Sequence, residues 1–231
     1  MVKNKPVYAF EEADSKKRML LGGKGAGLSE MTRLKLPVPP GFTITTEVCN
    51  KYYDNNRKLP KDVMPAVMKN IAKMEKKTGK KWNSTKNPLL VSVRSGAAIS
   101  MPGMMDTILN LGLNEKTVEG FAEQTKNPRF SWDSYRRFIQ LFGKVVFGVN
   151  DEKFDHVLDS AKKKQGVTDD SKLNVESLKK IVSEYKKICE KHTKRKFPDT
   201  PDEQLVLSIE AVFKSWMGER AIVYREKNNI T

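Results

Sequence analysis

Hydrophobic and polar residues follow two different patterns along this chain, one before and one after about residue 113. In the first part, short apolar runs predict strands at residues 7–10, 42–45, 88–93 and 107–111. Apolar residues three or four positions apart predict helices over residues 25–35 and 62–77, and a further helix after Thr46. Leu20 and Leu21 are expected to form a strand or loop that leads into the first helix. We therefore expect strands and helices around one mixed sheet in residues 1–113.

Beyond residue 114 the pattern is helical and strand signals disappear. Helices are predicted over residues 118–124, 132–149, 153–164, 175–192, 201–216 and 218–228. Proline and glycine residues at 128, 166 and 198 separate several of these segments. The predicted fold class is α+β, with a second domain of helices over residues 114–231 that packs on the first.

Composition adds less than the pattern does. With 38% hydrophobic and 31% charged residues, the chain is typical of a globular protein with a lysine-rich surface. Its net charge of +15 is compatible with nucleic-acid binding, but the lysines lie in helical stretches without interleaved aromatic residues, so this function is not favoured. No apolar run is long enough to cross a membrane, and no secretion signal precedes the first strand. Cys49 and Cys189 are expected to be reduced thiols, so we predict a cytoplasmic protein.

The first candidate for chemistry is a glycine cluster around one lysine. Gly22, Gly23, Lys24 and Gly25 stand where the first helix is expected to begin, and Gly27 follows. Glycine lets a backbone approach a ligand closely, and a helix N-terminus offers N–H groups to an anion. The spacing matches neither a Walker A loop nor the dinucleotide-binding motif. Contact with a phosphate and an unusual surface turn both remain open on this pattern alone.

The second candidate is an arginine at the end of a buried strand. Residues 91–93 are mostly apolar and lead to Arg94, which would present a fork of donors at the edge of the sheet. The loop that follows, residues 95–106, is rich in small residues and could cover a ligand. Asp106 at its end could bind a metal or cap an element. The two histidines, His156 and His192, are expected on helix surfaces.

These segments carry a resemblance to a known family. The runs at residues 20–26 (LLGGKGA), 36–42 (LPVPPGF), 91–97 (VSVRSGA) and 100–107 (SMPGMMDT) look like those of the pyruvate, phosphate dikinases. Residues 135–138 (YRRF) and 220–225 (RAIVYR) are similar to that family too. The chain departs from the family at Gly27, where asparagine is usual, and at Ala98, where arginine is common.

The resemblance implies the first lobe of an ATP-grasp domain plus a helical insertion. Carried over, Lys24 and Arg94 act on the ATP phosphates as the catalytic pair. The remaining binding residues implied by the family are Gly22, Gly23, Gly25, Ser95, Gly96, Ser100, Gly103, Met104 and, as a second phosphate contact, Arg137.

The resemblance also implies what else the reaction requires. ATP and inorganic phosphate would phosphorylate a histidine on another domain, and a pyruvate-binding barrel would then form phosphoenolpyruvate. Mg²⁺ ligands are expected in a second ATP-grasp lobe, which the chain would lack, so we expect this portion alone to be inactive. The alternative is a non-catalytic module whose basic helices bind a partner domain or nucleic acid; a steep salt dependence of DNA binding would indicate it.

Overall fold

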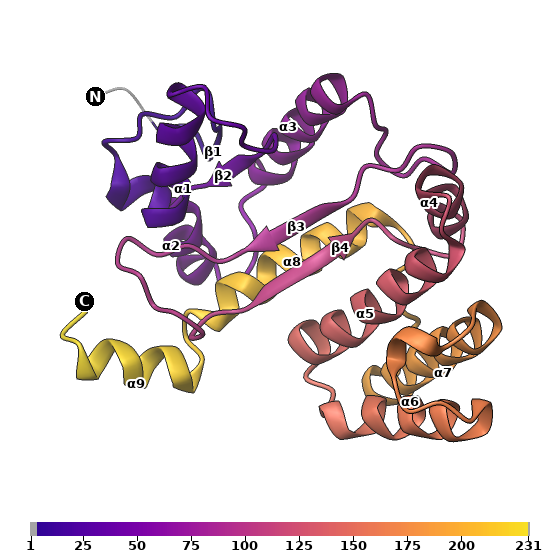
Figure 1. The fold of residues 1–231 in the computed structure, drawn as a ribbon. Coiled ribbons are helices and arrows are strands. Elements are labelled where there is room, and N and C mark those ends of the chain that lie inside the picture. Colours follow the sequence, from indigo (N-terminus) through magenta and orange to yellow (C-terminus); the bar gives the residue numbers. More distant parts are fainter. Residues whose placement is uncertain (1–3, 231) are drawn as a thin grey trace. The chain divides into compact units, whose positions relative to one another are not determined.

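The computed structural model describes residues 4–230, and its contacts divide the chain into two compact units. The first unit contains the residues up to 80, residues 94–106 and the residues from 212 onward. The second unit contains residues 81–93 and 107–211. The domain boundary that the sequence places at residue 113 stays a prediction. The mixed α+β fold class is confirmed, and helices predominate (Figure 1).

The first unit is built on a small sheet with helices packed around it. Its elements are β1 (Val7–Ala9), α1 (Arg18–Arg33), β2 (Phe42–Ile44), α2 (Thr46–Asp54), α3 (Val63–Thr78) and α9 (Glu219–Lys227). Strands β1 and β2 pair antiparallel, with Val7 opposite Ile44. Fully buried Tyr52 of α2 packs against the ring of Phe213 at 5.5 Å between centroids. Val63 and Val67 of α3 are also fully buried, so α2 and α3 supply much of this core.

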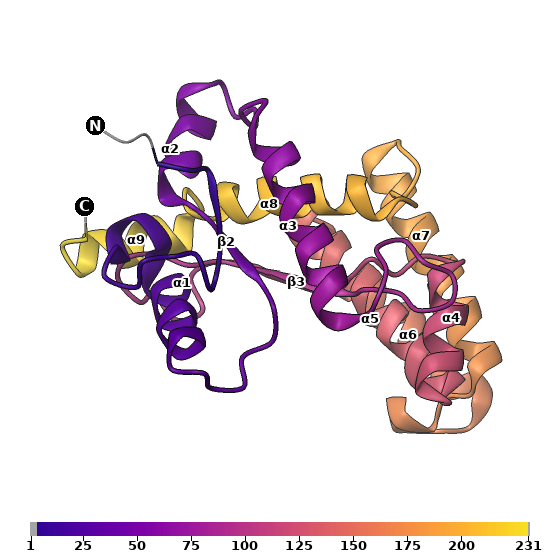
Figure 2. The same ribbon diagram turned by 90° about the horizontal axis from the view of Figure 1, so that it is seen from above.

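The second unit holds the other strand pair and most of the helices. Its elements are β3 (Val91–Arg94), β4 (Thr107–Leu111), α4 (Thr117–Thr125), α5 (Pro128–Phe147), α6 (Asp151–Gln165), a short 3₁₀ turn (Asp170–Lys172), α7 (Val175–Thr193) and α8 (Pro201–Ser215). The last residue of β3 and the last turn of α8 belong to the first unit. Figure 2, seen from above, shows α5, α6 and α7 gathered at one end of this unit. Tyr135, Phe138 and Phe142 project from one face of α5 into its core, and all are buried.

Capping side chains explain why the helices of the second unit begin where they do. The Asn127 side chain accepts a hydrogen bond from the Phe130 N–H, and Pro128 occupies the first turn of α5. Asn150 and Asn174 cap α6 and α7 in the same way. Each cap satisfies an N–H group that the first helical turn leaves without a partner.

Two sequence expectations about the strands and the first helix were wrong. The four strands do not form one mixed sheet but two separate two-stranded sheets, β1–β2 and β3–β4. Leu20 and Leu21 are not a strand or loop, because α1 already begins at Arg18 and buries both leucines. The sequence did not predict a helix beginning at Arg18 because glycine disfavours a helix, and Gly22 does interrupt this one.

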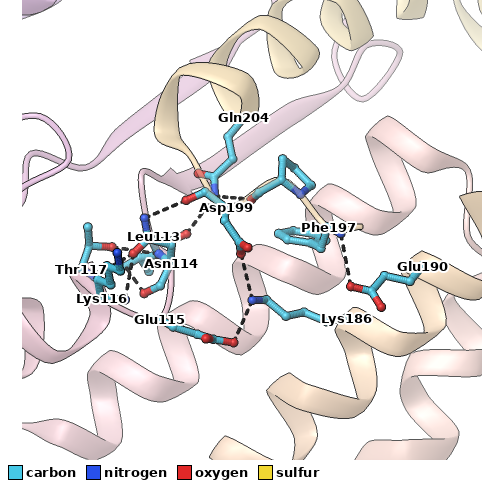
Figure 3. A network of polar contacts seen from close by, with 11 residues as sticks. Leu113, Asn114, Glu115, Lys116, Thr117, Lys186, Glu190, Phe197, Asp199 and Gln204 are labelled. Carbon is cyan, nitrogen blue, oxygen red and sulfur yellow. Dashed lines mark hydrogen bonds and ion pairs between the residues drawn. The ribbon is translucent and has the colours of Figure 1, made fainter. Parts of the chain in front are cut away.

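A buried glutamine connects two loops of the second unit through hydrogen bonds to their backbones (Figure 3). Gln204 is completely buried, and its amide donates to the carbonyls of Leu113 and Pro198 while it accepts from the Gly112 N–H. The loop after β4 is thereby tied to the start of α8. One side chain thus satisfies three buried backbone groups.

A lysine completes the same network from α7. Lys186 bonds the carboxylates of Glu115 at 2.9 Å and Asp199 at 3.1 Å, and it lies 5.9 Å from the ring centre of Tyr135. Burial raises the pKa of Tyr135 to about 12, so its hydroxyl stays neutral at physiological pH. The network therefore connects α5, α7 and both loops.

Replacing Gln204 with alanine is expected to lower the free energy of unfolding by about 3–5 kcal/mol, because three buried backbone groups lose their partner. Gln124→Ala is the matched control, since Gln124 is exposed and its side chain bonds Asn87 alone within residues 4–230; we expect a loss below about 1 kcal/mol. Urea unfolding of both variants measures the difference. Equal losses would show that the buried bonds of Gln204 contribute nothing specific.

Both cysteines are free thiols, as the sequence predicts. Burial raises the pKa of Cys49 to about 11 and that of Cys189 to about 12. Neither thiol is ionised at neutral pH, so neither is a candidate nucleophile.

Candidate functional site

The glycine cluster forms a kink inside α1. Gly22 has φ 71° and ψ 163°, a conformation open essentially to glycine alone, while the residues on both sides are helical. A Cβ atom at this position would lie 3.2 Å from the carbonyl carbon of Gly96. The kink thus lets a second segment, residues 95–98, lie directly against the helix.

Backbone contacts fix that segment on the kink. The Gly23 N–H donates to the Ala97 carbonyl oxygen at 2.8 Å. Gly25 is close-packed on the other side, because a Cβ there would lie 2.7 Å from the Thr43 hydroxyl of β2. Gly27, in contrast, faces open space. Gly22, Gly23 and Gly25 therefore lie where other atoms pack closely against the backbone, whereas Gly27 does not.

The structure brings the two predicted catalytic cations to the same short segment. Lys24 donates from Nζ to the carbonyl oxygen of Ser95 at 3.1 Å, and Arg94 immediately precedes Ser95. Ser95 is buried, whereas Lys24 and Arg94 are exposed. Within residues 4–230, neither side chain forms an ion pair, and the Arg94 guanidinium has no hydrogen-bond partner. Both positive charges are therefore available to an anion from solution.

A third cation that the sequence analysis missed lies on the same segment. Arg18 donates from Nε to the Ala98 carbonyl oxygen at 3.0 Å. Arg18 stands one helical turn before Gly22, and this spacing could have indicated it in the sequence. It was missed because the helix was predicted to begin only at residue 25. The region around the kink therefore carries three cationic side chains.

The predicted covering loop is held at both ends. Its beginning lies on the kink, and at its end the Asp106 N–H donates to the Ser215 hydroxyl at 3.3 Å. The Asp106 carboxylate lies 3.6 Å from the Arg220 guanidinium, so it has an ion-pair partner. Its roles as a metal ligand or a cap stay predictions. Between these ends Ser100 and Gly103 are exposed, Met104 is partly exposed and Met101 is buried. Gly103 has φ 72°, a left-handed conformation that turns the loop at an exposed position.

Arg137 belongs to a different unit from Lys24 and Arg94. It lies on α5 in the second unit, where its Nε is 3.2 Å from the carboxylate of Asp133. Its guanidinium therefore has an anionic partner already, and its role as a second phosphate contact stays a prediction.

The donor atoms around the kink do not suit a divalent metal. Mg²⁺ prefers carboxylate and water oxygens, whereas this site presents lysine and arginine side chains. In the part of the chain that the structure describes, no three His, Cys, Asp or Glu side chains gather to form a metal site. His156 and His192 are exposed, as predicted, on α6 and α7. None of the helices between residues 4 and 230 is long and apolar enough to span a membrane.

Comparison with known proteins identifies the family of this chain. The family model described as "Pyruvate phosphate dikinase, AMP/ATP-binding domain" matches residues 18–58 and 55–231. The chain belongs to this family. The predicted resemblance to the pyruvate, phosphate dikinases is thus confirmed.

Individual dikinases agree with the family model. The chain is 53% identical over 225 residues to the pyruvate, phosphate dikinase of Entamoeba histolytica, covering 97% of this chain and 25% of that protein. It is 48% identical over 225 residues to the enzyme of Clostridium symbiosum, with 97% and 26% covered. For the Rhizobium meliloti enzyme the identity is 47% over 228 residues, with 97% and 25% covered. The chain spans about a quarter of the length of these relatives.

Proposed function

We propose that this chain is the ATP-binding part of a pyruvate, phosphate dikinase and that Lys24 and Arg94 bind the phosphate groups of ATP. The observation that carries the proposal is that Lys24 bonds the carbonyl of Ser95, the residue next to Arg94, and that neither cation has an acidic partner within residues 4–230. The AMP/ATP-binding description of the family supports the same ligand. An exposed pair of cations on a glycine-rich kink is suited to a polyphosphate.

The two cations would contribute in different ways. The Arg94 guanidinium is a rigid fork that can bond two phosphate oxygens at once, whereas Lys24 acts as a compact charge. Lys24 would exchange its bond to the Ser95 carbonyl for one to phosphate, a small movement because both partners lie at the kink. Phosphoryl transfer depends mainly on positioning and charge, so fixed cations stabilise its transition state directly.

In this proposal, the other predicted binding residues of the first unit would surround the phosphates with these cations. Gly22, Gly23 and Gly25 would let the phosphates approach the backbone of α1, and Ser95 and Gly96 hold the second segment in place. Ser100, Gly103 and Met104 would cover the nucleotide from the loop over residues 95–105. In this account residues 1–113 correspond to the first ATP-grasp lobe and residues 114–231 to a helical insertion.

Other parts of a dikinase would complete the reaction. A histidine on another domain would accept the phosphoryl group derived from ATP, inorganic phosphate would be the co-substrate, and a barrel domain would transfer the group to pyruvate. Mg²⁺ would be bound by carboxylates outside this site, because the side chains at the kink do not suit it. We therefore propose that the chain alone does not form phosphoenolpyruvate.

A chimeric dikinase tests the proposal. In it, this chain replaces the matched segment of the Entamoeba histolytica enzyme, to which it is 53% identical. We expect the chimera to incorporate phosphate from radiolabelled ATP and to form phosphoenolpyruvate from pyruvate. Isotope exchange between pyruvate and phosphoenolpyruvate, which does not involve this chain, verifies that the remaining domains are intact. A chimera with normal exchange but no labelling by ATP would contradict the proposed function.

A further inference from the structure

We propose that Arg18 is a third phosphate-binding residue of this site, oriented toward the ligand by the Ala98 carbonyl. The inference deepens the proposed function and rests on it. It assigns to the first turn of α1 a direct contact with the polyphosphate, in addition to those of Lys24 and Arg94.

The orientation of Arg18 follows from its contacts at the kink. One nitrogen, Nε, donates to the Ala98 carbonyl oxygen at 3.0 Å. Another, Nη2, lies over Gly23, where a Cβ atom would come within 3.2 Å of it. Gly23 therefore leaves the space that the guanidinium occupies. One fixed donor and one close contact restrict a side chain that is otherwise free to rotate.

The rest of the guanidinium is unused. An arginine carries five N–H donors, and within residues 4–230 the bond from Nε is the only one that Arg18 forms. No carboxylate in that part of the chain pairs with it, and the residue is exposed. Its terminal nitrogens thus keep the geometry that matches two oxygens of a phosphate.

Local charge also points to an anion as the missing partner. Residues 18–24 and 94–98 contain three cations, Arg18, Lys24 and Arg94, and no aspartate or glutamate. One backbone hydrogen bond and two side-chain hydrogen bonds to backbone carbonyls join these two segments and hold the like charges in one region, an arrangement that a bound polyphosphate would neutralise. A purely structural role needs only the one exposed bond to Ala98, and exposed bonds of this kind stabilise proteins little.

Two substitutions of Arg18 and one matched control test the inference in the chimeric dikinase. Arg18→Ala is expected to raise KM for ATP about 10- to 100-fold and to change kcat less, because the contact is present before the transition state. Arg18→Lys keeps the charge but loses the fork, so we expect an intermediate KM. Lys17→Ala removes an adjacent exposed charge whose side chain forms no capping bond, and KM should stay unchanged.

The outcomes separate this inference from the proposed function. If Lys24→Ala raises KM for ATP and Arg18→Ala does not, Arg18 is not a phosphate ligand although the function stands. If Arg18→Ala lowers the melting temperature and slows pyruvate exchange as much as it slows the reaction with ATP, the role of Arg18 is structural and the inference is wrong. If neither Lys24→Ala nor Arg18→Ala affects ATP, the proposed function itself fails.

Discussion

Replacing Arg94 with alanine in the chimeric dikinase is expected to lower the rate of phosphorylation by ATP about 10²- to 10³-fold, the usual loss when one fixed transition-state donor is removed. The guanidinium has no partner within residues 4–230, so its removal leaves no buried group unsatisfied. The exchange between pyruvate and phosphoenolpyruvate should keep its normal rate. Rapid-quench labelling with radioactive ATP measures the first reaction, and isotope exchange measures the second.

Lys24→Ala should reproduce this selective loss. The two single substitutions together should cost less than the product of their separate effects, because both residues act on one charge distribution. The control is Lys17→Ala, an exposed lysine one residue before α1. Equal loss of both half-reactions in Arg94→Ala would contradict a role in ATP chemistry and would indicate a folding defect.

Replacing Gly22 with alanine is expected to damage both stability and ATP binding. Its φ of 71° and ψ of 163° are strained for any other residue, at a cost of about 1–3 kcal/mol. The added Cβ would also press on the Gly96 carbonyl group at 3.2–3.3 Å. Because this contact holds residues 95–98 against α1, KM for ATP should rise together with the loss of stability.

Gly27→Ala is the control from the same helix, and we expect it to act in the opposite direction. Nothing lies within 4 Å of a Cβ at this position. Alanine favours a helix interior over glycine by about 0.5–1 kcal/mol, so the variant should be more stable than the native chain. Urea unfolding and steady-state kinetics of both variants provide the comparison. A Gly22→Ala variant as stable as Gly27→Ala would show that the kink is not required.

The helices of the second half were largely predictable from the sequence. Their apolar residues recur at helical spacing, and asparagine caps or following glycines mark several ends, so α7 begins at Val175 as predicted. Strand β4 also matches its prediction, residues 107–111, because a short apolar run is bounded by turn residues. In these segments local propensity and tertiary packing favour the same structure.

The sheet arrangement and the true extent of α1 were not predictable in the same way. Whether β2 pairs with β1 or with β3 depends on contacts between residues far apart in the sequence, which periodicity does not contain. The kink at Gly22 depends on the close approach of Gly96, more than 70 positions away. Lys24 and Arg94 could be proposed from the sequence because their motifs are distinctive, whereas Arg18 could be proposed only once the fold placed it beside Ala98.

Covalent labelling of lysines tests the central claim, that Lys24 lies at the phosphates of bound ATP. An ATP analogue with an acyl group on its terminal phosphate transfers that group to a lysine in contact with it. In the chimeric dikinase we expect rapid acylation of Lys24, suppressed by excess ATP, while Lys16 and Lys17 react slowly and without protection. Labelling of Lys24 at the rate of these surface lysines, with no effect of ATP, would contradict the account.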